Sequence, residues 1–420
     1  MEMVLEFLRD VLSQPALLIG IMSCVGLIAL KRPFHKVMTG TLKPILGYLM
    51  LAAGAGVIVS NLDPLGKMIE HGFHITGVVP NNEAIVAVAQ KVLGVETMSI
   101  LVVGLLMNLC IARFTKFKYV FLTGHHSLFM ACLMSAVLGT AGLSGMELIL
   151  VGGFLMGAWS AISPAIGQSY TSKVTDGDEI AIGHFGSLGY YLSAWVAQYV
   201  GKAEDSTEDI EIPEKWGFLR DSTLSTALTM IVFYLIAAIA AGSEFVSTLS
   251  GDMSPYLYAV MSAMNFAVGV TIVYSGVRMI LGDLIPAFQG IATKIIPNAI
   301  PAVDCAVFFT YAPTAVVLGF LSSFIGGIIG MLILGAVGGV LIIPGLVPHF
   351  FCGATAGIYG NATGGRRGAA VGAFLNGLAI TFLPAMALPV LGQLGFQNTT
   401  FGDADFAVMG LVLGNAYEWV

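Results

Sequence analysis

Apolar residues in this chain come in long runs of about 15 to 25 residues, and this pattern predicts membrane-spanning helices. A transmembrane strand would instead show about ten residues that alternate between apolar and polar. Spans of about 20 residues are clearest near 16–30, 44–60, 98–112, 145–163, 223–247, 256–277, 317–343 and 368–391. We therefore expect an all-α polytopic membrane protein.

Five further stretches are apolar but are interrupted by His, Asp, Gly or Pro. They are residues 84–95, 119–140, 180–200, 282–312 and 346–362. Such segments are tolerated at membrane depth only where protein or a water-filled cavity satisfies the freed backbone groups. They predict broken or re-entrant elements around a solute site, and they bring the expected total to about ten or eleven spanning elements.

The composition supports a membrane protein and excludes other classes. Only 10% of the residues are charged and 57% are hydrophobic, so charge is too sparse to solvate a globular surface. The net charge of −7 and the lack of a dense basic cluster argue against nucleic-acid binding. The five cysteines stand singly, which predicts neither a disulfide framework nor a thiolate metal site. No phosphate-binding loop or nucleophile elbow is present, so we expect no catalysis by this chain alone and no cofactor.

Charge also predicts the topology. Positive residues mark cytoplasmic loops, and the first such group follows the first span, so the N-terminus is predicted to lie outside. A hydrophilic linker, 201–222, divides the single membrane domain, 1–420, into a first half, 16–200, and a second half, 223–400. The groups predicted to be cytoplasmic are Lys31, Arg32 and Lys36; Arg113, Lys116 and Lys118; Lys202, Lys215 and Arg220; and Arg366 with Arg367.

Polar residues inside the apolar segments are the candidates for function. An ionisable group at the bilayer centre costs at least about 2.5–3.5 kcal/mol, so one that persists there is a functional candidate by default. Each has a structural alternative: a histidine can bond a backbone carbonyl, and an aspartate can hold helix N-termini. Together they predict one polar pocket for a small polyhydroxylated solute, and without a paired His motif we expect no metal. The residues are His125 with His126, His184, Asp304 and His349.

Several long blocks are similar to one known family. They include LTGHH (122–126), VTDGDEIAIGHFGS (174–187), GVRMILGDLIPAFQGIATKIIPNAIPAVDCAVFFTYAPTAVVLGF (276–320) and LIIPGLVPHFFCGATAGIYGNATGGRRGA (341–369). In order and spacing they resemble the ascorbate-type enzyme IIC permeases of the bacterial phosphoenolpyruvate-dependent phosphotransferase system.

The resemblance implies a permease in the bacterial inner membrane that moves L-ascorbate or a closely related sugar acid. A separate cytoplasmic enzyme IIB would phosphorylate the solute and would receive its phosphate from an enzyme IIA. The family is homodimeric, with a V-motif scaffold and a core domain that carries the solute in an elevator-like motion.

Matched motif by motif, the family's binding histidines fall on His125 and His184 and its aspartate on Asp304. Two glutamines of the family are replaced here by Phe129 and Phe185. Because a buried hydroxyl without a partner costs about 1–3 kcal/mol, either other polar side chains take over or the solute is another sugar acid or a pentitol. The expected substitutes are His126, Ser127 and Ser187.

Two other classes of function remain open at this point. Asp304 and the histidines would be the coupling groups of a secondary transporter driven by protons or sodium. A membrane scaffold without transport would bind no sugar-like solute at all.

Overall fold

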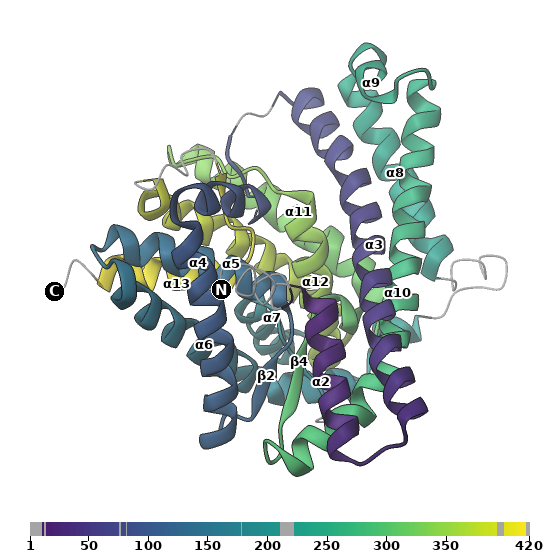
Figure 1. Cartoon of the computed structure of the whole chain (residues 1–420). Coiled ribbons are helices and arrows are strands. Elements are labelled where there is room, and N and C mark those ends of the chain that lie inside the picture. The colour runs from purple at the N-terminus through teal and green to yellow at the C-terminus, as the bar shows by residue number, and fades with distance from the viewer. Residues whose placement is uncertain are drawn as a thin grey trace.

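The computed structural model describes residue 11 and residues 14–74, 77–80, 82–177, 179–210, 222–392 and 399–416 (Figure 1). Helices make up most of this part of the chain, and the strands are short. The prediction of an all-α polytopic protein is confirmed.

Two groups of helices form the fold. The arm group consists of α2 (Pro15–Ala29), α3 (Phe34–Gly72), α8 (Ser222–Ala241), α9 (Ser243–Ser250) and α10 (Pro255–Lys294). Its members pack mainly on one another, with α3 along α10, and Figure 1 shows α3, α8 and α10 side by side. The core group consists of α4 (Asn82–Phe114), α5 (Gly124–Thr140), α6 (Gly145–Thr175), α7 (Ser187–Val200), α11 (Pro313–Ala336), α12 (Leu346–Gly392) and α13 (Ala404–Ala416).

Each group takes helices from both halves of the sequence. Within the core group, α4 packs on α5 and α6, whereas α12 packs on α7, α11 and α13. The pairing of α7 with α12 joins the end of the first half to the second half. Helices of the two halves therefore pack against one another.

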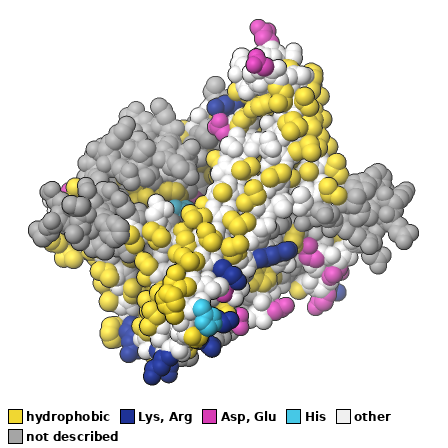
Figure 2. All heavy atoms as spheres, turned by 45° about the vertical axis from the view of Figure 1, so that its right-hand side comes forward, with side chains coloured by type: hydrophobic (Ala, Val, Ile, Leu, Met, Phe, Trp, Pro, Cys, Tyr) yellow, Lys and Arg dark blue, Asp and Glu magenta, His cyan; other side chains and the backbone are white. Residues whose placement is uncertain are grey.

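Long apolar faces remain exposed on the arm helices. Leu228, Val232, Ile236 and Ile239 of α8 are all at least 42% exposed. Figure 2 shows apolar side chains along this face, with charged side chains gathered toward its ends. Apolar patches of this extent indicate contact with another apolar phase, which for spans of this length is the lipid bilayer.

Six helices are long and apolar enough to cross a membrane, or up to seven if the bent pair α8 and α9 counts as one span; this applies to the described residues. Residues 84–95 lie in the first part of α4, and residues 346–362 lie in the first part of α12. Each of these two predicted segments is therefore part of a longer helix that also contains a predicted span. The prediction that these two segments are broken was wrong; α12 breaks only later, at Gly364 and Gly365. The expected ten or eleven elements are reached only if the shorter helices α2, α5, α7 and α13 are counted.

The other three predicted broken segments each contain a short strand. Strands β2 (Tyr119–Phe121), β4 (Ile300–Val303) and β3 (Ala181–Ile182) form a parallel sheet in the order β2-β4-β3. A second parallel pair joins β1 (Val79–Pro80) to β5 (Thr399–Thr400). Because unpaired backbone groups are costly away from water, pairing across the halves lets extended chain persist among apolar helices.

The first part of the predicted linker, 201–222, is docked on the core group. It contains the 3-10 helix η1 (Thr207–Asp209), and the Glu208 carboxylate accepts backbone N–H bonds of 3.0 and 3.1 Å from Thr314 and Ala315 at the start of α11. A carboxylate at a helix N-terminus is favourable both as a cap and toward the helix dipole. Residues 211–221 lie outside the described part.

Close helix packing in the arm group depends on paired glycines. A Cβ atom on Gly290 of α10 would collide with the carbonyl oxygen of Gly26 of α2, whereas one on Gly282 of the same helix would meet nothing. Small residues of this kind let membrane helices approach closely.

We predict that Gly290→Ala lowers the thermal stability of the purified protein in detergent, because overpacking against backbone costs about 1–3 kcal/mol. Gly282→Ala is the matched control and should melt at or slightly above the wild-type temperature, since alanine favours helix over glycine. Equal melting temperatures for the two variants would show that α2 and α10 do not meet at Gly26 and Gly290.

Candidate functional site

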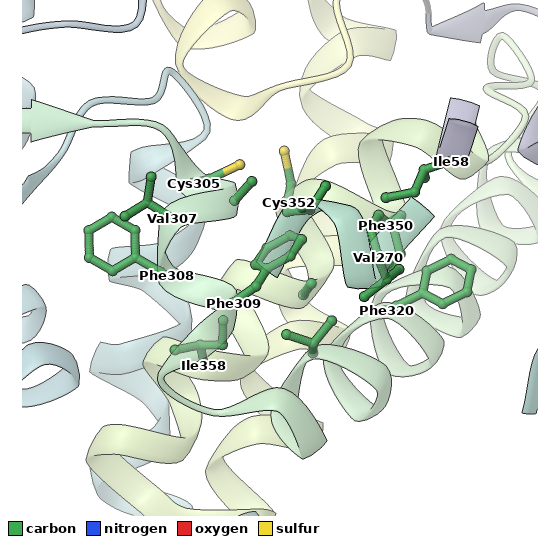
Figure 3. Close-up of a cluster of buried hydrophobic side chains, with 14 of the residues drawn as sticks. Ile58, Val270, Cys305, Val307, Phe308, Phe309, Phe320, Phe350, Cys352 and Ile358 are labelled. Carbon is green, nitrogen blue, oxygen red and sulfur yellow. The ribbon is translucent and has the colours of Figure 1, made fainter. Parts of the chain in front are cut away.

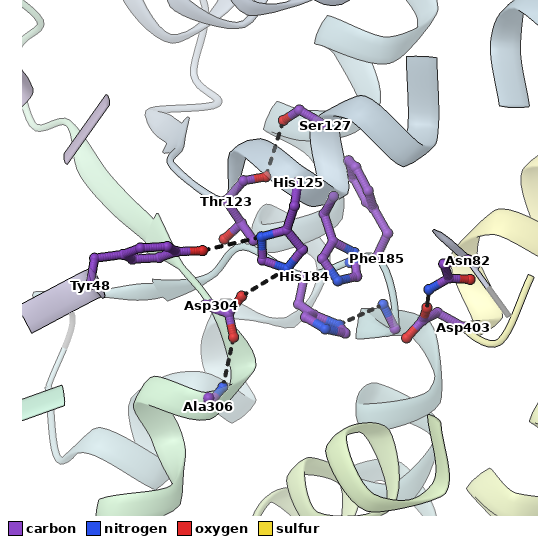
Figure 4. Close-up of polar contacts among 12 residues, drawn as sticks. Tyr48, Asn82, Thr123, His125, Ser127, His184, Phe185, Asp304, Ala306 and Asp403 are labelled. Atoms are coloured by element: carbon purple, nitrogen blue, oxygen red, sulfur yellow. Dashed lines mark hydrogen bonds and ion pairs between the residues drawn. The ribbon is translucent and has the colours of Figure 1, made fainter. Parts of the chain in front are cut away.

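Three of the predicted site residues lie at the same edge of the three-stranded sheet. His125 follows β2 at the start of α5, His184 follows β3, and Asp304 follows β4. Because the strands are parallel, their carboxyl ends meet at one edge, which is where open sheets in other proteins bind ligands. Figure 4 shows these side chains converging from separate segments.

Asp304 is fixed by its own backbone and faces His125. Its Oδ1 accepts the N–H of Ala306 at 3.0 Å, which caps the 3-10 helix η3 (Cys305–Thr310), and its Oδ2 lies 3.4 Å from Nε2 of His125. The hydroxyl of Tyr48, from α3 in the arm group, lies 3.2 Å from Nδ1 of His125. The Asp304 side chain is 8% exposed and that of His125 38%, so His125 presents the more accessible polar surface.

A buried aromatic cluster holds η3 in place. Phe309 packs edge-on against Phe350, with ring centroids 5.7 Å apart, and Phe350 meets Phe320 at 5.5 Å (Figure 3). Edge-to-face contacts of this kind are favourable beyond the area they bury. Packing against α11 and α12 therefore anchors the turn that carries Asp304.

The tautomers of His126 and His184 follow from their backbone partners. The N–H of Phe185 donates to Nδ1 of His126 at 3.3 Å, and the N–H of Gly186 donates to Nδ1 of His184 at 3.1 Å. The Tyr190 hydroxyl lies 2.8 Å from the same Nδ1 of His184 and, with that nitrogen an acceptor, is a second donor to it. An amide N–H can only donate, so both Nδ1 atoms are acceptors, and we infer that each neutral ring carries its proton on Nε2. Each ring therefore offers one N–H donor.

The second strand pair supplies another polar group. Asn82 follows β1 and Asp403 follows β5, and Asn82 Nδ2 donates to Asp403 Oδ2 at 2.6 Å. Cys352 Sγ donates to Asp403 Oδ1 at 2.7 Å. One potential ligand atom each of His126, His184 and Asp403 lie within 4.8 Å of one another.

Geometry alone would allow this trio to hold a cation, but its hydrogen bonds oppose that interpretation. The Nδ1 lone pairs of both histidines already accept backbone protons, and the Nε2 atoms carry the ring protons. A metal ion requires an unprotonated nitrogen with a free lone pair. The hydrogen bonds of the two histidines therefore disfavour a metal ion at this trio.

A cavity of about 1400 Å³ connects these groups. Five of the predicted residues line it, as do Tyr48, Asn82, Asp403 and Cys305, which the sequence analysis did not single out. The ion pair Lys67–Asp63, 2.8 Å between Nζ and Oδ2, and Glu70 line another part of the wall. The predicted residues on the wall are His125, His126, Phe129, His184 and Asp304.

Three predicted residues do not line this cavity. The Ser127 hydroxyl donates to the carbonyl of Thr123 at 3.3 Å, and Ser187 is fully buried against Asp405. Phe185 is fully buried and stacks on Phe121, with ring centroids 4.6 Å apart. We therefore do not place Ser127, Ser187 or Phe185 in contact with solute.

His349 is also apart from the pocket, although it was predicted to share it. Its Nδ1 lies 2.9 Å from the hydroxyl of Ser323, where α11 packs on α12. The structural alternative, a satisfied buried histidine, describes it better.

The residues missed by the sequence analysis carried weak local signals. Tyr48 lies in an ordinary apolar span, and aromatic residues there are common. Asp403 stands just before the apolar helix α13 and Asp405 lies in its first turn, and two acids at that position could have been noted. Asn82 and Asp403 are 321 residues apart, so only the pairing of β1 with β5 brings them together.

Comparison with known proteins shows the family of the chain. A family model described as the PTS system sugar-specific permease component matches residues 10–405. The chain belongs to this family. The chain is 26% identical, over an alignment of 474 positions, to the ascorbate-specific PTS system EIIC component of Mycoplasma pneumoniae (strain ATCC 29342 / M129 / Subtype 1). The alignment covers 98% of this chain and 70% of that protein.

The resemblance inferred from the sequence is thus confirmed at the level of the family. The protein is a multi-pass membrane component of a sugar phosphotransferase system, and it acts as a permease subunit instead of an enzyme on its own. EIIC components of such systems cooperate with EIIB and EIIA components and take a sugar substrate.

Asp405 positions the turn that follows His184. Its carboxylate accepts the Ser187 hydroxyl at 2.8 Å, the Leu188 N–H at 2.9 Å and Nε1–H of Trp159 at 3.3 Å. A buried acceptor with three donors caps α7 and ties it to α13.

We predict that Asp405→Ala destabilises the EIIC component, because three buried donors lose their acceptor and each unmet buried group costs about 1–3 kcal/mol. Thermal unfolding in detergent, followed by tryptophan fluorescence, measures this effect. Asp252→Ala, in an exposed turn, is the control and should unfold with the wild type. If both variants unfold together, Asp405 does not hold this turn.

Proposed function

We propose that this EIIC component carries L-ascorbate, or a closely related sugar acid, across the bacterial inner membrane while a separate enzyme IIB phosphorylates it. The convergence of His125, His184 and Asp304 at one sheet edge inside a cavity carries the proposal. The name of the Mycoplasma pneumoniae relative supports the choice of solute.

The chemistry of the cavity suits an acidic polyol. A carboxylate such as Asp304 accepts hydroxyl protons, whereas the Nε2–H groups of His126 and His184 donate to enolate, carboxylate or hydroxyl oxygens. The N-terminus of α5 begins beside His125, and the positive end of its dipole favours an anionic group nearby. The wall therefore offers both acceptors and donors to one small solute.

One side of the cavity is apolar where the family carries an amide. Phe129 lines it, and its ring meets those of His125 and Phe406 edge-on, at centroid separations of 5.8 and 6.3 Å. An aromatic face packs against the C–H face of a sugar-like ring. This difference leaves a related sugar acid or a pentitol as an alternative substrate within the same proposal.

We propose an elevator-like motion in which the core group moves relative to the arm group. The arm group would be the V-motif scaffold. The polar residues at the two sheet edges lie on core-group helices or in the segments that directly follow the strands. Tyr48, in contrast, lies on α3 of the arm group. The bond between Tyr48 and His125 would then form and break during transport. Following the resemblance, we also propose a homodimer. From the distribution of positive charge we propose that the N-terminus lies outside.

Phosphorylation accounts for the direction of transport. A phosphate adds about 1.5 to 2 negative charges at neutral pH, and a product with this added charge no longer matches a pocket with two carboxylates. Accumulation then needs no ion gradient.

The main alternative, proton-coupled transport, is less well supported by the geometry. The ring of His125 meets that of His126 edge-on at a centroid separation of 4.8 Å, and the rings of His126 and His184 are tilted by 45° at 3.7 Å. No hydrogen bond links one imidazole to another within the described residues, so these histidines do not form a direct proton relay.

We predict that vesicles containing this component and its phosphocarrier partners take up labelled L-ascorbate only when phosphoenolpyruvate is supplied. An uncoupler should leave that uptake unchanged. Asp304→Asn should abolish it, because the acceptor charge at the sheet edge is removed, whereas Asp252→Asn in an exposed turn should not. Uptake that needs no phosphoenolpyruvate and collapses with the uncoupler would contradict the proposed function.

A further inference from the structure

The Asn82–Asp403 pair is a second polar group on the cavity wall, besides the site at the edge of the three-stranded sheet. The pair is constructed like the main site, because each residue follows the carboxyl end of a parallel strand, β1 or β5. Besides the 2.6 Å bond between their side chains, Asn82 Oδ1 accepts the N–H of Gly402 at 2.9 Å. Both side chains line the same cavity as His184 and Asp304.

Asp403 is held in place but is not saturated. The residue is 4% exposed, and its carboxylate accepts one bond from Asn82 and one from Cys352. An ionised carboxylate has about four acceptor positions, and no Lys or Arg pairs with Asp403 among the described residues. A buried carboxylate with open acceptor capacity, lining a cavity, is suited to hydroxyl protons from a solute.

The two carboxylates stand at opposite ends of a row of imidazoles. Asp304 contacts His125, His125 neighbours His126, and the His126 ring lies 3.7 Å from that of His184. Asp403 closes the row, since one of its oxygens lies within 4.8 Å of a nitrogen of both His126 and His184. Figure 4 shows Asp304 on one side of the histidines and Asp403 on the other.

We propose that Asp403, oriented by Asn82 and Cys352, is a second hydroxyl-binding point, so that the solute is bound at both ends of the imidazole row. The inference rests on the proposed function and narrows its substrate class. The solute must carry a hydroxyl donor at each end, with acceptor oxygens between them for the imidazole N–H groups. A solute without the distal hydroxyl leaves the remaining acceptor positions of the buried Asp403 carboxylate unfilled and binds about tenfold or more weakly.

The test compares three solutes on three forms of the protein. Isothermal titration calorimetry on the purified full chain in nanodiscs measures the affinity for L-ascorbate and for its 5-deoxy and 6-deoxy analogues. The forms are the wild type, Asp403→Asn, which keeps the shape and removes the charge, and Asp252→Asn as an exposed control. Thermal unfolding of each form shows whether it is folded.

For the wild type we expect at least one deoxy analogue to bind about tenfold more weakly than L-ascorbate. Asp403→Asn should bind L-ascorbate about tenfold more weakly and should no longer distinguish it from that analogue. Asp252→Asn should behave as the wild type.

Three outcomes would overturn the inference. If Asp403→Asn binds L-ascorbate like the wild type, or keeps the full discrimination against the analogue, Asp403 does not contact the solute. If Asp403→Asn fails to fold, the inference is tested on the wild type alone. Equal affinity of the wild type for L-ascorbate and for both analogues would then contradict it. If the wild type binds neither L-ascorbate nor any of a panel of sugar acids and pentitols, the proposed function fails and the inference fails with it.

Discussion

The structure depends on the pairing of extended backbone in a region where water cannot satisfy it. Strands β2, β3 and β4 interrupt apolar segments that would otherwise be helices, and they remain only because each finds a parallel partner. The pairing crosses the two halves of the chain, since β4 of the second half lies between β2 and β3 of the first. Parallel order then brings all three carboxyl ends, and the polar residues that follow them, to one edge.

The same constraint accounts for the chemistry of the pocket. Backbone N–H groups at the strand ends fix His126 and His184 as Nε2–H donors, and the N–H of Ala306 fixes one oxygen of Asp304. The polar side chains are thus oriented before any solute arrives, which reduces the ordering cost of binding. Function and fold therefore use the same few backbone hydrogen bonds.

Part of this site could be predicted from the sequence and part could not. His125, His184 and Asp304 stand out because an ionisable residue in an apolar run is expensive, and that cost is visible locally. Tyr48 carries no such cost, and Asn82 and Asp403 become neighbours only through the pairing of β1 with β5. Segment 346–362 was expected to be broken because of its Gly and Pro residues. It is nevertheless continuous helix, since packing on α7 and α11 outweighs those local preferences.

The central claim, that the edge of the three-stranded sheet lines a cavity that admits a small hydrophilic solute, can be tested by cysteine accessibility in native membranes. His125→Cys lies on the cavity wall, whereas Ser127→Cys, two residues later in the same helix, is buried away from it. A small hydrophilic thiol reagent, read out by mass spectrometry of the labelled peptides, should modify the cysteine at 125 and leave that at 127 unmodified. Equal resistance of both cysteines to the reagent would contradict this account.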